Sequence, residues 1–313
     1  MATSGTAENR ARGRSGGSKT ATARKKSNGS NGDYTHLLPR RISPSRASDY
    51  QQCPKLFYYK SLLGLSTPAT KDTCKGTLAH YAFEKVFDHP RGERSEDRAV
   101  PYVREHWAEI STKPDYQEIA ALGEQAVEEM LTEAEGLVRK WFSVERPNNF
   151  DPEERELYVK AIAAGVEVHG YIDRLDKIVG EDGSIRWIIS DYKTGKPARE
   201  PYLEKAFFGM NVYAMLINKM LGIKVSKLRL IYVKNGNRED VVSQKVDEQR
   251  LARTERELGR IWQNIVKMAK AGEFPTKKSV LCDWCHFKEV CPAWATELAS
   301  IPIMNRDGEP YPR

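Results

Sequence analysis

The sequence predicts an α/β domain with a mixed central sheet, flanked by helices and closed by a small cysteine-bearing segment. Two observations carry this prediction. Apolar residues recur at helical spacing as far as about residue 142, and from about residue 156 the period becomes that of strands. A dense run of cysteines then follows the last helical pattern, near the C-terminus.

The first half of the chain predicts helices. Ser48 is the expected N-cap of one helix, and a second helix is expected to follow Gly76. Residues 116–142 predict one long helix, because their apolar residues repeat at helical spacing. Pro147 and Pro152 break the pattern after it.

The second half predicts strands with two further helices. Short β-rich runs predict strands at 157–163, 166–178, 185–191, 228–233 and 241–246. Helices are expected at about 203–221 and at 247–271, the second of which is clearly amphipathic. The tripeptide Glu181-Asp182-Gly183 predicts the turn between the second and third strands, and Asn235-Gly236 predicts a hairpin between the last two.

The chain of 313 residues has a net charge of +7, and most of it lies at the N-terminus. Residues 1–32 contain seven cationic side chains and one acidic one, so a net +6 belongs to this segment. The nearly neutral remainder argues against a uniformly basic surface. The segment either adds sequence-independent attraction to phosphates or is a solubilising disordered tail, and its composition fits both equally well.

These patterns predict three parts. We expect a disordered basic tail over 1–36, a folded domain over 37–300 that includes the cysteine segment, and a C-terminal tail over 301–313. No run of about 18 apolar residues occurs, so no membrane span is expected. The N-terminus lacks the apolar stretch of a secretory signal. A cytoplasmic location is therefore expected, where clustered cysteines are more often metal sites than disulfides.

Two carboxylates are expected to meet on neighbouring strands. Asp191 and Lys193 are two residues apart on a predicted strand, so they share one face of the sheet. If the turn Glu181-Asp182-Gly183 is centred on Asp182, Asp173 falls opposite Asp191, and Leu175 falls opposite Ile189. A slip of one residue would put the two carboxylates on opposite faces, so this register is a strict requirement.

Such a pair suits phosphodiester chemistry. Carboxylates hold Mg²⁺ or Mn²⁺, which neutralises the charge that builds up on phosphorus. Lys193 would orient and help to deprotonate the attacking water or stabilise the developing charge, and His80 would offer an imidazole to a manganese-like ion. Each residue also has a structural explanation. An Asp-x-Lys pair is usually a solvated face, a single histidine is usually structural, and Asp173 has Arg174 and Lys177 as potential ion-pair partners.

Three motifs occur in a fixed order, namely Gly76-x3-His80, Gly170-Tyr-Ile-Asp173-Arg-Leu-Asp and Ile189-Ser-Asp191-Tyr-Lys193-Thr-Gly195. They follow a segment Ser43-Pro-Ser-x-Ala-Ser-x-Tyr50-x2-Cys53-Pro54. In order and spacing, over about residues 40–295, they resemble the RecB-type branch of the PD-(D/E)xK nuclease superfamily. The resemblance implies a restriction-endonuclease-like fold. It also implies that His80, Asp173, Asp191 and the backbone carbonyl of Tyr192 bind the metal and that Lys193 is catalytic.

One position departs from that family. Its usual Gln-x3-Tyr is here Gly209-x3-Tyr213, so the positioning role of the glutamine is absent or falls to another residue such as Asn211. Tyr213 either contacts DNA or packs within its helix. Tyr58, Tyr59 and Tyr192 are weaker candidates for stacking on single-stranded DNA.

Four of the five cysteines form a candidate metal site. Cys282, Cys285 and Cys291 make a Cys-x2-Cys-x5-Cys-Pro run, and Cys53 lies in a second Cys-Pro far upstream. With His286, the run would make a local zinc site. The four cysteines also resemble those of the [4Fe–4S]-binding nucleases, such as the AddB-type and CRISPR-adaptation enzymes, which implies a cluster that joins Cys53 to residues 280–293. Cys74 is expected to be a packed thiol.

The resemblance implies a metal-dependent DNA exonuclease that acts at single-stranded ends in recombination, repair or phage- or CRISPR-type DNA processing. The sequence contains no Gly-x4-Gly-Lys-Ser/Thr loop, so any helicase or recombination partner would be a separate protein. Two alternatives remain. One is a non-catalytic DNA-binding module with a zinc knuckle, and the other is a structure-directed endonuclease of the same fold.

Overall fold

The computed structural model describes residues 32–200 and 202–294. Six strands form one mixed sheet, which confirms the predicted fold class. The strands are β1 (Arg41–Ile42), β2 (Glu154–Ala163), β3 (Val166–Val179), β4 (Ile185–Lys193), β5 (Val225–Tyr232) and β6 (Val241–Lys245). They follow the order β1-β3-β4-β5-β6, and β2 pairs with β3 in addition.

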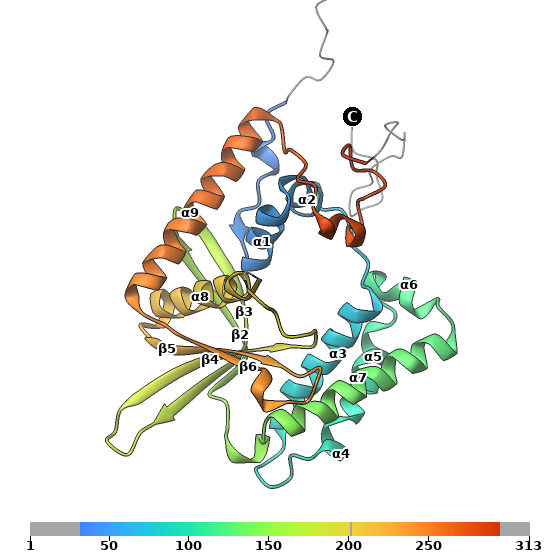
Figure 1. Cartoon of the computed structure of the whole chain (residues 1–313), viewed down its shortest axis with the longest axis vertical. Helices are drawn as coiled ribbons and strands as arrows, with labels where there is room; N and C mark the ends of the chain where they lie inside the picture. The colour runs from blue at the N-terminus through green and yellow to red at the C-terminus, as the bar shows by residue number, and fades with distance from the viewer. Residues whose placement is uncertain (1–31, 201, 295–313) are drawn as a thin grey trace, which may run out of the picture. The chain divides into compact units, whose positions relative to one another are not determined.

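Helices pack on both faces of this sheet (Figure 1). One apolar cluster joins the sheet to α1 (Pro44–Gln52), α8 (Tyr202–Leu221) and α9 (Glu248–Ala271). A second cluster joins the other face to α3 (Lys71–Lys85), α5 (Pro101–Ile110) and α7 (Glu124–Val144). The shorter helices are α2 (Pro54–Phe57), α4 (Glu96–Ala99) and α6 (Gln117–Ala120). No helix within the described ranges is long and apolar enough to span a membrane.

The register of β3 and β4 is the predicted one. Leu175 lies opposite Ile189, and the antiparallel ladder ends one pair further on, at Arg174 and Ser190. Beyond that point β4 continues in parallel beside β5, as far as the pair Lys193–Tyr232. Asp173 and Asp191 therefore lie just beyond the last β3–β4 pair, where the two strands separate.

Three predicted helix boundaries are wrong, each for a local reason. The first helix is capped by the side chain of Ser43 instead of Ser48, and it stops at Cys53, which is extended because a proline follows it. The helix expected after Gly76 begins earlier, at its N-cap Thr70, and contains the glycine. The single helix expected over 116–142 is divided at Gly123, whose φ of +94° no helix can include.

All five predicted strands are present, with ends that differ by up to three residues. β2 and β5 each begin three residues earlier than predicted, β3 and β4 end one and two residues later, and β5 and β6 end one residue earlier. The short strand β1 was not predicted. The connection between β5 and β6 is centred on Gly236, at φ +72°, as the Asn-Gly signal predicts. It is wider than a two-residue turn, because the short 3₁₀ segment Arg238–Asp240 is included in it. Tails were predicted over 1–36 and 301–313, and residues 1–31 and 301–313 lie outside the described residues. The remaining residues 32–36 are described, and a short 3₁₀ helix, Thr35–Leu37, begins within them.

Candidate metal-binding and catalytic site

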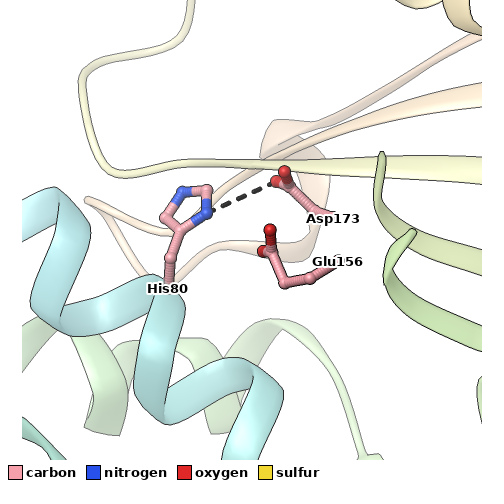
Figure 2. Close-up of side chains that lie close together, drawn as sticks. All are labelled: His80, Glu156 and Asp173. Atoms are coloured by element: carbon pink, nitrogen blue, oxygen red, sulfur yellow. Dashed lines mark ion pairs between the residues drawn. The ribbon is translucent and has the colours of Figure 1, made fainter. Parts of the chain in front are cut away.

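Asp173 is fixed at the point where the two strands separate. Its Oδ2 accepts a hydrogen bond from the backbone N–H of Tyr192 at 2.8 Å. The carboxylate thus replaces the ladder partner that this N–H lacks beyond the last β3–β4 pair. The same oxygen lies 3.5 Å from Nδ1 of His80 (Figure 2).

His80 reaches the sheet because a glycine precedes it by one helical turn. A Cβ on Gly76 would lie 3.1 Å from Oγ1 of Thr194, in the segment that follows β4. Glycine therefore lets α3 lie close against the end of β4, and the residue four positions later points to the same side of the helix. The Gly-x3-His spacing is explained by this packing.

Asp191 and Lys193 share a face of β4, as predicted. The Nζ of Lys193 lies 2.6 Å from Oδ2 of Asp191. Burial raises the pKa of Asp191 to about 6, and the nearby charge of Asp173 adds to the effect. Burial alone would lower the pKa of Lys193, but Asp191 outweighs it and the pKa is raised. In the absence of metal, Lys193 is therefore a cation at neutral pH, which favours charge stabilisation over proton abstraction.

Glu156 is a member of this site that the sequence analysis missed. The ligand atoms of His80, Glu156 and Asp173 all lie within 4.8 Å of one another (Figure 2). One side of Glu156 faces solvent, but burial of its carboxyl, followed by the charges of Asp173, Glu84 and Asp191, raises its pKa to about 7. The predicted strand began at 157, three residues after the observed start at Glu154, and so it excluded Glu156. The tight Ala164-Gly165 turn would have set Glu156 opposite Asp173.

The donor set fits a hard divalent cation. The imidazole of His80 and the carboxylates of Glu156 and Asp173 converge from α3, β2 and β3, and Asp191 lies beside them on β4. Burial, followed by the nearby charge of Asp173, raises the pKa of both Glu156 and Asp191. Oxygen donors with an imidazole suit Mn²⁺, and carboxylates with water suit Mg²⁺. A cation would relieve the repulsion within this set.

Tyr213 forms one wall of the site. A Cβ on Gly170 would lie 2.5 Å from Cε1 of Tyr213, so the second motif glycine provides room for this ring. Burial raises the pKa of Tyr213, and the charges of Asp191 and Asp173 add to the effect, which places its hydroxyl near the carboxylates. Tyr213 thus packs against β3 at Gly170, and a contact with DNA stays a prediction.

Asn211, the residue considered as a substitute for the missing glutamine, is engaged elsewhere. The side-chain amide of Asn211 donates to the Phe207 carbonyl and to Oε1 of Gln244, both at 2.8 Å. A Cβ on Gly209 would lie 3.4 Å from Cβ of Pro44, so this position serves the packing of α8 against α1.

Of the aromatic candidates for base stacking, Tyr59 and Tyr192 are buried, and Tyr58 is partly buried. Tyr59 is 5% exposed, and its ring lies against Phe287 with centroids 5.1 Å apart. Tyr58 stacks on Phe274 with centroids 5.4 Å apart. These contacts favour a structural role for both rings.

A buried ion-pair network supports the site from within. Arg174 follows Asp173 and is 1% exposed. Its guanidinium donates to both carboxylate oxygens of Glu145, at 2.8 and 2.9 Å, and to the hydroxyl of Tyr192. Asp176 completes the pairing at 3.1 Å. The network joins the end of α7 to the two strands that carry Asp173 and Asp191.

The four predicted cysteines line one cavity that is open to solvent. Cys53 enters it from the junction of α1 and α2, and Cys282, Cys285 and Cys291 enter it from the C-terminal segment. The backbone N–H of Ser279 donates to Cys282 Sγ and lowers the pKa of that thiol, which favours the metal-binding thiolate. His286, which a local zinc site would need, is not among the described residues that line the cavity, and its ring packs against Phe287.

Cys74 is separate from this set, as predicted. It lies in α3 and is fully buried, and burial raises its pKa to about 11. A thiol in that state is a poor metal ligand.

The family follows from comparison with known sequences. The profile of the PD-(D/E)XK nuclease superfamily matches residues 41–292. The chain belongs to this superfamily. It therefore contains a nuclease domain, for which the implied substrate is DNA. The superfamily inferred from the three motifs is confirmed, and the RecB-type branch stays a prediction.

Solved structures with a similar fold are distant from this chain. One is a protein from Eubacterium rectale with a provisional exonuclease name, at 13% identity and a TM-score of 0.49, with 80% of this chain and 89% of that chain covered. Another is the protein SSO0001, at 16% identity and a TM-score of 0.34, with 72% and 98% covered. These likenesses add nothing to the family assignment. No curated protein sequence matches the chain.

Proposed function

We propose that this protein is a metal-dependent deoxyribonuclease of the RecB-type branch that degrades DNA from single-stranded ends. The observation that carries the proposal is the convergence of His80, Asp173 and Asp191 beside Lys193. A non-catalytic DNA-binding module needs neither the carboxylates nor the lysine. The alternative of a structure-directed endonuclease shares the site and differs only in the substrates that it accepts.

The proposed metal is Mg²⁺ or Mn²⁺, held by His80, Asp173, Asp191 and the backbone carbonyl of Tyr192. Bound there, it would supply positive charge to the phosphate and lower the pKa of a bound water. The protein supplies the positions. Tyr192 N–H orients the Asp173 carboxylate, and the ion pair with Asp191 orients the Lys193 ammonium toward developing negative charge. Tyr213 limits access from the side of α8 and is a candidate contact for DNA.

We also propose that Cys53, Cys282, Cys285 and Cys291 bind a [4Fe–4S] cluster. Four thiols around one cavity support four-thiolate ligation, and the pairing of a distant cysteine with a local run is unlike most zinc knuckles. A cluster agrees with the expected cytoplasmic location, where thiols stay reduced. A separate helicase or recombination protein would supply unwound ends.

The decisive experiment is digestion of DNA with Mn²⁺ by the wild type, Asp191→Asn and the control Asp97→Asn. Asp97 is an exposed residue of α4, remote in the sequence from every motif. We expect end-labelled single-stranded DNA to be degraded by the wild type and the control, and at least about a hundredfold more slowly by Asp191→Asn. Equal rates of DNA degradation by Asp191→Asn and the wild type would refute the proposed nuclease activity of this site. Rapid cleavage of circular single-stranded DNA would instead favour the endonuclease.

A further inference from the structure

We propose that Glu156 is a further ligand of the metal, so that β2 supplies a donor to the site along with α3, β3 and β4. The inference rests on the proposed function, because it assigns another residue to the same centre. It concerns a residue that none of the three motifs contains.

The backbone of Glu156 is shaped for this position. The pairs on either side of it in the β2–β3 ladder, Arg155–Arg174 and Leu157–Ile172, are formed in register, but Glu156 and Asp173 do not form the pair between them. Glu156 has a φ of +46°, in the left-handed region, although it is not a glycine and lies within a strand. That conformation is costly for a residue with a side chain and is typical of functional positions.

The side chain of Glu156 has no cation to neutralise it among the described residues. The charges that act on it are those of Asp173, Glu84 and Asp191, all negative. Arg155, its neighbour in the chain, is turned to other partners, since it donates to the Glu84 carbonyl at 2.7 Å and to Asp88 at 2.9 Å. A strained residue that brings one more carboxylate to two others is best explained by a cation shared between them.

Figure 2 shows the three side chains that would share it. The imidazole of His80 comes from α3, and the carboxylates of Glu156 and Asp173 come from adjacent strands and point to the same space. Asp191 reaches Asp173 from the other side and is paired with Lys193. Glu156 thus completes the donor set on the side away from the lysine.

Metal affinity is the direct test, because it does not depend on turnover. We would measure Mn²⁺ binding at pH 8 by calorimetry for the wild type, Glu156→Gln and the control Glu154→Gln. Glu154 is an exposed residue of the same strand, paired normally with Leu175. We expect Glu156→Gln to weaken Mn²⁺ binding by about tenfold or more, by analogy with losses around metal sites, and the control to bind as the wild type does.

A second variant separates ligation from a structural role. Glycine adopts a positive φ without strain, so Glu156→Gly should lose Mn²⁺ affinity while its Tm stays equal to that of the wild type or rises. A clearly lower Tm for Glu156→Gly would show that Glu156 acts in folding and would overturn the inference.

The two proposals can fail separately. If the wild type does not bind Mn²⁺, the proposed function fails. If the wild type binds Mn²⁺, Asp191→Asn loses the binding and Glu156→Gln keeps wild-type affinity, the function stands and only the role of Glu156 is wrong.

Discussion

The glycines of the first two motifs, Gly76 and Gly170, leave space for neighbouring side chains, and each helps to place a different residue of the site. Gly76 lets α3 approach Thr194, and so carries His80 to the sheet. Gly170 lies under the ring of Tyr213, where a Cβ would be 2.5 Å from Cε1. Neither Gly76 nor Gly170 has a positive φ, so each is needed for its small size and not for its backbone conformation.

Replacement of Gly170 by alanine should therefore disturb Tyr213 and its neighbours. The added methyl group would overlap the ring, and relief requires a shift of α8 or of β3, at a cost of about 1–3 kcal/mol in the free energy of unfolding. Gly136→Ala is the matched control, because a Cβ there meets nothing within 4 Å and Gly136 lies within α7. The control should be neutral or slightly stabilising in a urea titration. Equal stability for Gly170→Ala and Gly136→Ala would contradict the steric account.

At the level of elements, turns allowed the sheet to be predicted in detail. The register of β3 and β4 followed from the Glu-Asp-Gly turn, because one centred turn fixes every pair of a hairpin. Leu175 opposite Ile189 is the consequence, and the position of Asp173 relative to Asp191 follows from it. The placement of Asp173, Asp191 and Lys193 was thus predictable once the second and third motifs were set on strands.

The errors arose where one residue changed the local backbone. Pro54 ends the first helix and Gly123 divides another, although the apolar pattern continues through both. Glu156 was missed because the predicted strand began after it, and its left-handed backbone, which is imposed by its surroundings, is no property of glutamate that a sequence pattern would reveal. Patterns of side chains predict elements, but they do not predict strain that tertiary contacts maintain.

The junction of α7 with the sheet depends on a buried ion pair, and we expect it to be sensitive to loss of one partner. Glu145→Gln leaves the Arg174 guanidinium buried without its main counter-charge, which should cost about 3–5 kcal/mol of stability. Glu128→Gln removes the partner of Arg104 in an exposed pair and should change little. Urea unfolding of both variants at pH 7 provides the comparison, and similar midpoints would refute the role of the buried pair.

The same pair predicts a pH dependence. The pKa of Glu145 is lowered, since Arg174 outweighs the effect of burial. A carboxylate with a lowered folded-state pKa contributes stability above its ordinary value, near 4.5, and loses it as the pH falls through the lower value. The stability difference between wild type and Glu145→Gln should therefore be full at pH 6 and shrink below about pH 4.5. A constant difference down to pH 3 would contradict this.

At the scale of the whole described domain, the site draws on both sides of the sheet. His80 comes from the helices of one face, and Tyr213 comes from α8 on the other (Figure 1). The sheet between them presents the carboxylates and Lys193. The geometry of the site therefore depends on the packing of both helical layers against the sheet. The cysteine cavity joins the first helices of the described residues to the segment that follows α9.

If the four cysteines bind a cluster, Cys53 should be essential to a cross-link that closes a long loop. By analogy with disulfides, such a cross-link contributes on the order of 5 kcal/mol by restricting the unfolded chain. Cys53→Ser, purified without oxygen, should therefore lose its iron and unfold at a markedly lower temperature.

Cys74→Ala is the control, because Cys74 lies outside the cavity, and it should keep the iron content and brown colour of the wild type. A colourless wild type with stoichiometric zinc would exclude the cluster. An unchanged iron content in Cys53→Ser would show that Cys53 is not a ligand. The cluster would then not cross-link Cys53 to the C-terminal cysteines.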